Sequence, residues 1–201
     1  TANTAVGAFS LDANTTGDNN TALGQHSLSS NTTADNNTGL GYNSLSANTT
    51  GNSNVAVGSL ALDANTTANN SVAVGYSALT SNTTGSRNTT VGSMSLEQNT
   101  TGVNNTAMGY QALENNTTGS YNVTLGYKSL EANNADNNTA VGFESLKANT
   151  SGIDNTATGA NALDANTTGN YNSAFGTHTL GANTGGVRNT ALGRGSLASN
   201  T

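Results

Sequence analysis

Few side chains in this 201-residue sequence could take part in catalysis. The two histidines, His26 and His178, stand at equivalent places of a repeated segment but nine repeats apart, so they cannot meet within one chain. The chain has no cysteine, and it contains neither a phosphate-binding glycine loop nor a Ser, His and Asp grouping that would activate a nucleophile. The sequence therefore predicts a protein that is not an enzyme, with no catalytic residue, no metal site and no cofactor.

Carboxylates gather at one place of the repeat and are the residues best suited to attract a cation. Glu97, Glu114 and Glu131 follow one another at 17-residue intervals, and carboxylate oxygens are the ligands that calcium prefers. Lys147 occupies the next position of the same series, which is more typical of a solvated charged face. We prefer the second interpretation for this set, which also contains Asp12, Asp63 and Asp164.

Aromatic residues share another place of the repeat. Exposed rings can stack on sugars or anchor a protein partner, because they offer a large apolar surface in a rigid form. The alternative is that these rings only cover a corner of the fold. The candidates for surface contact are Tyr42, Tyr76, Tyr110, Tyr127 and Phe143.

Two series of Asn-x-Thr/Ser sequons run along the chain and are candidates for N-glycosylation. Glycans would add solubility to a chain in which only 8% of the residues are charged. The alternative is that Asn and Thr serve in turns and in hydrogen-bonded ladders. The first series comprises Asn14, Asn31, Asn48, Asn65, Asn82, Asn99, Asn116, Asn149 and Asn166, and the second includes Asn19, Asn36, Asn104, Asn122 and Asn137.

All these candidates are positioned by one 17-residue repeat. Its unit reads Asn-Thr-Ala-Val-Gly-x-x-Ser-Leu-x-Ala-Asn-Thr-Thr-Gly-x-x, and its places are numbered from the first Asn, which is Asn3 in the first unit. One unit is a residue shorter, because the glycine spacing falls to 16 between Gly126 and Gly142. An unbroken Gly and Leu in every unit indicates a folded array rather than a disordered chain. The structural residues expected from these series include Gly7, Gly24, Gly41, Gly58, Gly75, Leu11, Leu28, Leu45, Leu62, Leu79 and Leu96.

Each unit is expected to form two short strands and two corners. The first strand is exemplified by residues 72–74, and Gly75 ends it because glycine can adopt the positive φ of a corner. A second strand is expected over residues 77–81, and the Asn-Thr-Thr-Gly segment at residues 14–17 has the composition of a type I turn. The sequence thus predicts an all-β fold, a parallel β-solenoid of twelve 17-residue coils in which equivalent residues stack into columns. Residues 1–201 form a single array, expected to be a window of a longer repetitive protein.

The core of such a coil is thin, since each unit offers one Leu and one Val-type residue. Some apolar columns are therefore expected to be buried against another chain, with small residues at the third and eighth places allowing close approach. This predicts a homo-oligomer. The net charge of −6 argues against a nucleic-acid partner, and no apolar run is long enough for this segment to insert in a membrane.

The segment Asn70-Ser71-Val72-Ala73-Val74-Gly75, followed by Tyr76-Ser77-Ala78, resembles the YadA-like head repeat of trimeric autotransporter adhesins. Residues 53–58 are nearly as close, and related repeats occur in phage tail fibres and other secreted repeat proteins. The resemblance covers the whole chain as an array. It implies a left-handed β-roll, three chains around one axis and a role in binding surfaces or matrix.

These features predict a non-enzymatic segment of an extracellular fibre or adhesin head, located at a cell surface or in a virion fibre. A rigid trimeric rod would attach to a host surface, matrix or glycan through repeated weak contacts. One alternative is a self-assembling extracellular filament with an N-linked glycan coat. Another is a ligand-recognition solenoid that binds ice or glycans, although the adjacent threonines at residues 15–16 argue against a flat ice-binding array.

Overall fold

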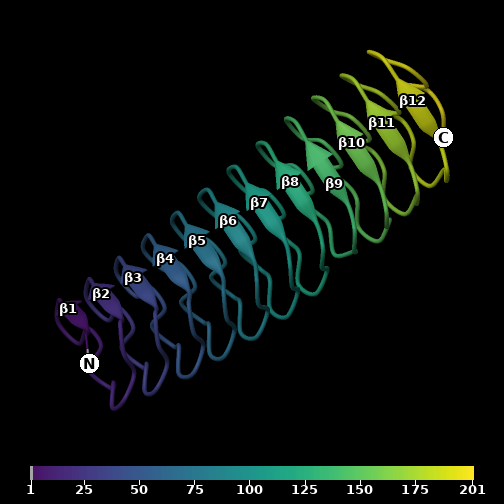
Figure 1. The fold of residues 1–201 in the computed structure, drawn as a ribbon. Coiled ribbons are helices and arrows are strands. Elements are labelled where there is room, and N and C mark those ends of the chain that lie inside the picture. The colour runs from purple at the N-terminus through teal and green to yellow at the C-terminus, as the bar shows by residue number, and fades with distance from the viewer. Residues whose placement is uncertain (1) are drawn as a thin grey trace.

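Twelve three-residue strands stack in chain order into one parallel sheet, which runs the length of an elongated rod (Figure 1). The computed structural model describes residues 2–201, and this part of the chain contains no helix, so none that could cross a membrane. The predicted β-solenoid is therefore confirmed. The strands are β1 (Thr4–Val6), β2 (Thr21–Leu23), β3 (Thr38–Leu40), β4 (Val55–Val57), β5 (Val72–Val74), β6 (Thr89–Val91), β7 (Thr106–Met108), β8 (Val123–Leu125), β9 (Thr139–Val141), β10 (Thr156–Thr158), β11 (Ser173–Phe175) and β12 (Thr190–Leu192).

Each coil contains one strand, and the prediction of a second strand over residues 77–81 is wrong. Ser77 and Leu79 have left-handed backbone angles, with φ of 51° and 56°, that a pleated strand does not accommodate. The segment still pairs with the next coil, because the Leu79 N–H donates to the Ser95 carbonyl at 3.0 Å. The backbone therefore turns continuously here without losing its hydrogen bonds between coils.

Glycine at the fifth place ends each strand, as predicted, because no other residue fits there. Gly75 has a φ of 140°, and a Cβ on it would lie 2.5 Å from the carbonyl oxygen of Gly92 in the next coil. Both the backbone angle and the close stacking of coils exclude a side chain. The corner after every strand depends on this column of glycines.

A side chain closes the Asn-Thr-Thr-Gly corner, for which the sequence predicts a type I turn. Asn14 Nδ2 donates to the carbonyl of Gly17 at 3.0 Å. The N–H groups of Thr15 and Thr16 both donate to the carbonyl of Thr32 in the next coil, at 2.9 and 3.2 Å. A corner of this kind satisfies its backbone through neighbouring coils, so it is stable only in a stack.

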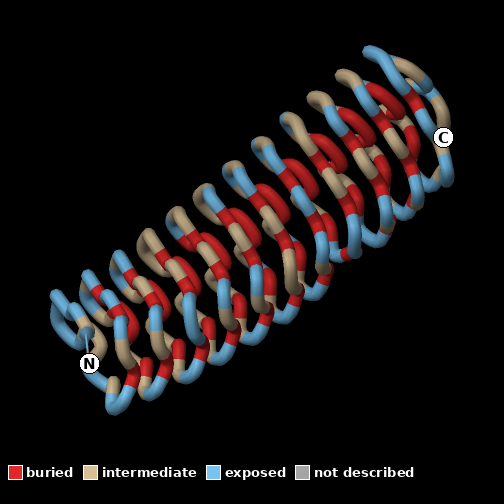
Figure 2. Tube along the Cα trace, in the orientation of Figure 1, coloured by how far each residue is buried: buried red, intermediate tan, exposed pale blue. Residues whose placement is uncertain are grey.

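Buried residues recur at equivalent places of successive coils along the rod (Figure 2), and the apolar ones are small side chains and one leucine. Ala73 at the third place, Ala78 at the eighth and Leu79 at the ninth are all fully buried. The expectation that small residues at the third and eighth places face another chain is therefore wrong. They allow the two walls of the same coil to approach each other, and the leucine fills the space that remains.

Two asparagine ladders run through the rod and confirm the ladder interpretation of the Asn columns. At the twelfth place, Asn48 Nδ2 donates to Asn31 Oδ1 at 2.9 Å. At the first place, the Asn37 N–H donates to Asn20 Oδ1 at 2.9 Å, and Asn37 Nδ2 to the Gly51 carbonyl at 2.8 Å. These buried amides exchange hydrogen bonds along the axis, so they hold successive coils in register.

The 16-residue unit keeps the sheet in register because its missing residue lies in a corner. Thr106 pairs with Val123, and Val123 with Thr139, as in other coils. Asn134 Oδ1 accepts the N–H groups of Thr117 and Thr118 at 3.0 and 2.9 Å, which replaces the threonine carbonyl that serves this purpose elsewhere. A side-chain carbonyl thus takes over the role of a lost backbone carbonyl.

The shortened corner interrupts one ladder. Asn133 Nδ2 donates to the Ala135 carbonyl at 2.8 Å. The buried Oδ1 of Asn116, which precedes Asn133 in the ladder, has no hydrogen-bond partner among residues 2–201. The Asn ladder of the twelfth place is therefore continuous from Asn14 to Asn116 and resumes beyond it at Asn133.

Candidate interaction surfaces

The outward side of the parallel sheet carries an apolar ribbon along the whole rod. The middle residue of each strand from β2 to β12 is buried, whereas the first and third residues point outward and are half-buried or exposed. We call the first and third residues of β1–β12 the sheet face. Its third residues are Val6, Leu23, Leu40, Val57, Val74, Val91, Met108, Leu125, Val141, Thr158, Phe175 and Leu192.

Large apolar side chains on the sheet face remain accessible to solvent. Leu125 is 51% exposed and Leu40 is 39% exposed, although both belong to the interior strands of the sheet. Contiguous exposed apolar patches of more than a few hundred Å² mark interaction sites in soluble proteins. The sequence predicted that some apolar column would need a partner chain, and the structure identifies the sheet face as the column that the coil itself does not bury.

The aromatic column lies on the corner that follows the strands, and all five of its members are exposed. Tyr110, Tyr127 and Phe143 come from consecutive coils and stack with centroid distances of 5.6 and 5.3 Å. Tyr42 and Tyr76 stand two coils apart, with Ser59 at the same place of the coil between them, and neither takes part in a ring stack within residues 2–201. The predicted contact residues thus form one continuous aromatic strip and two separate rings.

Besides Phe175 on the sheet face, three further aromatic side chains on the surface were not selected as candidates from the sequence. Tyr121 and Tyr171 are exposed at the last place of their coils, and the Arg188 guanidinium lies 5.6 Å from the centre of the Tyr171 ring. Phe9 stacks on His26 in the next coil at 5.0 Å. The signal that could have found them is the 17-residue spacing, since Phe9 and His26 share the seventh place.

Charged side chains at the seventh and tenth places of two consecutive coils form a network, and the tenth-place members belong to what we call the charged column. Lys128 Nζ lies 2.9 Å from Glu131, and Lys147 Nζ lies 2.8 Å from Glu144 and 4.0 Å from Glu131. The hydrogen bond to Glu131 raises the pKa of Lys128. Opposite charges therefore alternate here, which agrees with a solvated face.

Three carboxylates of this column that have no lysine beside them have raised pKa values. Burial raises the pKa of Glu97, and the charge of Glu114 in the next coil raises it further. Burial also raises the pKa of Asp63 and of Asp164. Within residues 2–201, no three His, Cys, Asp or Glu side chains are grouped so that they could hold a metal ion.

The first sequon series faces inward. Asn48 Nδ2 donates to Asn31 Oδ1 and to the Gly51 carbonyl, each at 2.9 Å, so both amide hydrogens are used. A glycan on such a nitrogen would remove one of these bonds and would have to pass through the packed coil. The fold favours the ladder interpretation for this series, in which Asn14 is half-buried and the following members are buried: Asn31, Asn48, Asn65, Asn82, Asn99, Asn116, Asn149 and Asn166.

The second sequon series is divided by the fold. Asn19, Asn36 and Asn137 are exposed, Asn104 is half-buried and Asn122 is buried in a ladder. Among these members, the glycosylation hypothesis is therefore compatible with the folded rod at the last place of the unit and not at the buried Asn122.

The hydroxyl of the first threonine at the Asn-Thr-Thr-Gly corner joins its coil to the next. Thr15 Oγ1 donates to the Thr32 carbonyl at 2.9 Å, and Thr49 Oγ1 to the Thr66 carbonyl at 3.0 Å. These donors bond within the rod and are not available to order water, whereas the second threonines of the corner, such as Thr16 and Thr50, are exposed.

Comparison with known proteins does not assign the chain to a family. No family model matches the sequence, and neither a curated protein nor a solved structure matches it. The surfaces of the rod itself are therefore the basis for a functional proposal.

Proposed function

We propose that this chain is a non-enzymatic segment of an extracellular fibre or adhesin head, at a cell surface or in a virion fibre. Three copies associate through their sheet faces around a common axis. The corners of the resulting rigid rod then contact a host surface, matrix or glycan. Because the coils repeat, many weak contacts act together and raise the avidity without a single strong site.

The sheet face is the observation that carries this proposal. None of its residues is charged, and the third residue of every strand except β10 is apolar. The central parts of protein interfaces are depleted in charged residues and enriched in apolar ones. A continuous ribbon of this kind on one side of a straight rod suits a parallel partner of equal length, which a second and third copy of the chain provide. The number three comes from the resemblance of residues 70–75 to YadA-like repeats.

The native mass of the purified chain tests the assembly. A mass near three times 20.0 kDa is expected. A mass of 20.0 kDa would contradict the trimer and favour a self-sufficient ligand-recognition solenoid. Larger, open-ended species would favour the self-assembling filament.

A charge placed on the sheet face tests the interface directly. Leu125 is 51% exposed in a single chain, so Leu125→Lys leaves the coil folded but places an ammonium group in the proposed interface. We expect this variant to be monomeric by light scattering. Thr101→Lys adds the same charge on an exposed corner and serves as the control. The proposal fails if both variants retain the native mass, or if both lose it.

A further inference from the structure

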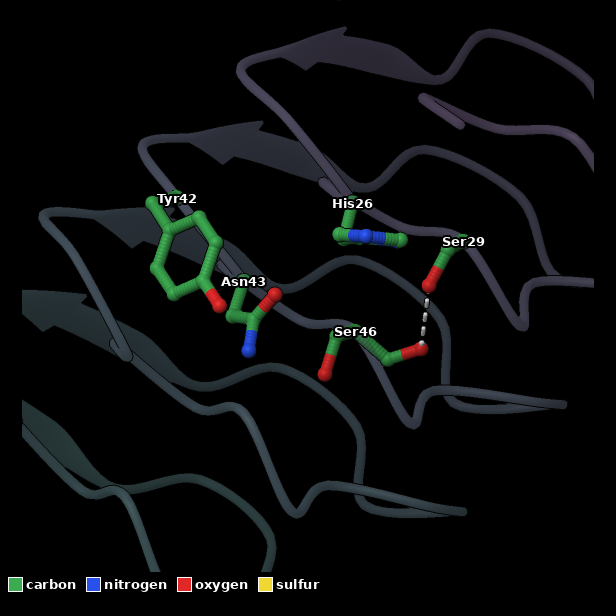
Figure 3. A pocket seen from close by; sticks show the side chains of 5 residues that line it. All are labelled: His26, Ser29, Tyr42, Asn43 and Ser46. Carbon is green, nitrogen blue, oxygen red and sulfur yellow. Dashed lines mark hydrogen bonds between the residues drawn. The ribbon is translucent and has the colours of Figure 1, made fainter. Parts of the chain in front are cut away.

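A hollow of about 280 Å³ opens at the corner that follows β2 and β3. Figure 3 shows the five side chains that line it: His26, Ser29, Tyr42, Asn43 and Ser46. Small side chains at the tenth place of the repeat leave the space for this hollow. Ser29 and Ser46 occupy this place in two consecutive coils, whereas the coils on either side carry the larger Asp12 and Asp63.

The side chains around the hollow retain free hydrogen-bonding groups. Within residues 2–201, neither the Asn43 amide nor the His26 imidazole makes a hydrogen bond, although both are half-buried. Ser46 Oγ reaches the Asp63 carbonyl only at 3.4 Å. The hollow therefore offers an amide, an imidazole and a hydroxyl whose donors and acceptors are little used by the protein.

Parts of the wall of the hollow are held in fixed positions. The His26 N–H donates to the Ala8 carbonyl at 3.0 Å, and the Asn43 N–H to the Gln25 carbonyl at 3.1 Å. Phe9 stacks on one face of the His26 ring with an interplanar angle of 7°. A ligand would therefore lose little entropy in ordering the His26 ring and the backbone of Asn43.

The ring of Tyr42 supplies an apolar wall. It is 49% exposed and takes part in no ring stack within residues 2–201, in contrast to the stacked Tyr110, Tyr127 and Phe143. An aromatic face beside clustered hydroxyl and amide groups matches a sugar, which has an apolar face of C–H bonds and a rim of hydroxyl groups.

The charges around the hollow favour uncharged sugars over anionic ones. No lysine or arginine lines the hollow, so a carboxylate, sulfate or phosphate would find no opposite charge. Asp12 and Asp63 stand at the tenth place of the coils on either side and would repel an anion. The chemistry of the hollow therefore favours an uncharged ring.

We propose that this hollow binds one pyranose ring of a neutral saccharide. The C–H face of the ring packs on Tyr42, and its hydroxyl groups bond to Asn43, His26 and Ser46. The site deepens the proposed function, on which it rests for its role in attachment, by naming a neutral glycan as the target. It lies beyond the corner glycine Gly41 and uses no residue of the sheet face through which the three chains are proposed to associate.

Titration followed by NMR tests the site with defined probes. The methyl glycosides of glucose, galactose and mannose are added separately to the full chain, and the side-chain amide signals of Asn43 are monitored. At least one probe is expected to produce a saturable shift of these signals, with a dissociation constant in the millimolar range typical of a single small contact site, about 1 mM. Methyl glucuronide has the glucose ring with a carboxylate in place of the C6 hydroxymethyl group and is expected to bind more weakly.

Two tyrosine variants provide the matched comparison. Tyr42→Ala is expected to weaken binding by about tenfold or more, because it removes the apolar wall. Tyr76→Ala removes an equally exposed ring at the same place of the repeat, outside the hollow, and is expected to have no effect. Unchanged backbone spectra show that both variants fold.

Three outcomes would overturn the saccharide site. They are the absence of a saturable shift with all three neutral probes, equal loss of binding in Tyr42→Ala and Tyr76→Ala, and glucuronide binding as tight as that of the glucoside. None of them changes the native mass, which tests the trimeric rod separately. A monomeric chain that still binds a glycoside through Tyr42 would contradict the trimer and leave the saccharide site standing.

Discussion

The leucines of the ninth place combine complete burial with a left-handed backbone. Leu79 is fully buried and has a φ of 56°. This conformation costs an L-residue about 1–2 kcal/mol relative to the right-handed region. The packing of the leucine against its neighbours in the adjacent coils must outweigh that cost, so this residue is placed by the stack and not by local preference.

Shortening this side chain is expected to destabilise the rod. Leu79→Ala should lower the free energy of unfolding by about 2–5 kcal/mol, because it leaves a cavity between two packed walls. Leu60 has a similar φ of 62° but is only half-buried, so Leu60→Ala should cost less than about 1 kcal/mol. Urea unfolding followed by circular dichroism compares the two variants. Equal losses would show that the leucine column is not the core.

The glutamates of the charged column make stability depend on pH. The pKa of Glu97 is raised in the folded state, first by burial and then by Glu114. Protonated Glu97 therefore contributes fully to the stability of the fold below the ordinary carboxylate pKa of about 4.3. This contribution is lost as the pH rises through the raised pKa of the folded state. We expect Glu97→Gln to have a higher Tm than the parent at pH 7 and the same Tm near pH 4.

The same substitution at Glu131 is expected to have the opposite effect on the Tm. It lies 2.9 Å from Lys128 and 4.0 Å from Lys147, so Glu131→Gln removes attractive contacts and should lower the Tm at pH 7. Thermal unfolding at pH 7 measures both effects. If Glu97→Gln and Glu131→Gln shifted the Tm in the same direction, this account of the two glutamates would be wrong.

Among the elements of the fold, the corners tolerate variation that the strands do not. The shortened unit loses its residue between Asn133 and Ala135, while the flanking strands β8 and β9 keep their pairing. A residue lost from a strand would turn every later side chain to the other face. The corner instead replaces a backbone acceptor with the side chain of Asn134.

Because the Asn134 side chain replaces a backbone acceptor, substitution of Asn134 is expected to destabilise this corner. Asn134→Leu keeps the size of the side chain but leaves the N–H groups of Thr117 and Thr118 without their acceptor. We expect faster amide hydrogen exchange at these two residues and a loss of about 1–3 kcal/mol in stability. Asn115→Leu is the control, since Asn115 is exposed and its side chain makes no hydrogen bond within residues 2–201. Unchanged exchange in Asn134→Leu would refute the role of this oxygen.

For the molecule as a whole, stability arises from contacts between neighbouring coils. Every strand pairs only with the strands before and after it, and the Asn ladders connect the same neighbours. The rod is therefore close to a one-dimensional stack, in which each coil adds a similar increment.

Removing one complete coil should therefore preserve the fold. Deletion of residues 54–70 brings Leu45 over Leu79 and Asn48 over Asn82, which restores every column. We expect the same circular dichroism per residue and a small decrease in Tm. Deletion of residues 54–61 removes half a coil and should disrupt the stack around it. A similar loss of structure in both variants would contradict the stacked-coil description.

The sequence by itself determined the coil length, the parallel stacking and the identity of the buried leucines, because a side chain that recurs every 17 residues meets its own equivalent in the next coil. It also indicated the Asn ladders, since amides stacked along an axis can bond to one another. It did not determine that residues 77–81 turn rather than extend, because Ser77 and Leu79 adopt left-handed angles that only the neighbouring coils stabilise. Nor did it decide which apolar column the coil buries: only the tertiary structure places the alanines inside, the sheet face outside, and two consecutive serines, Ser29 and Ser46, beside Tyr42.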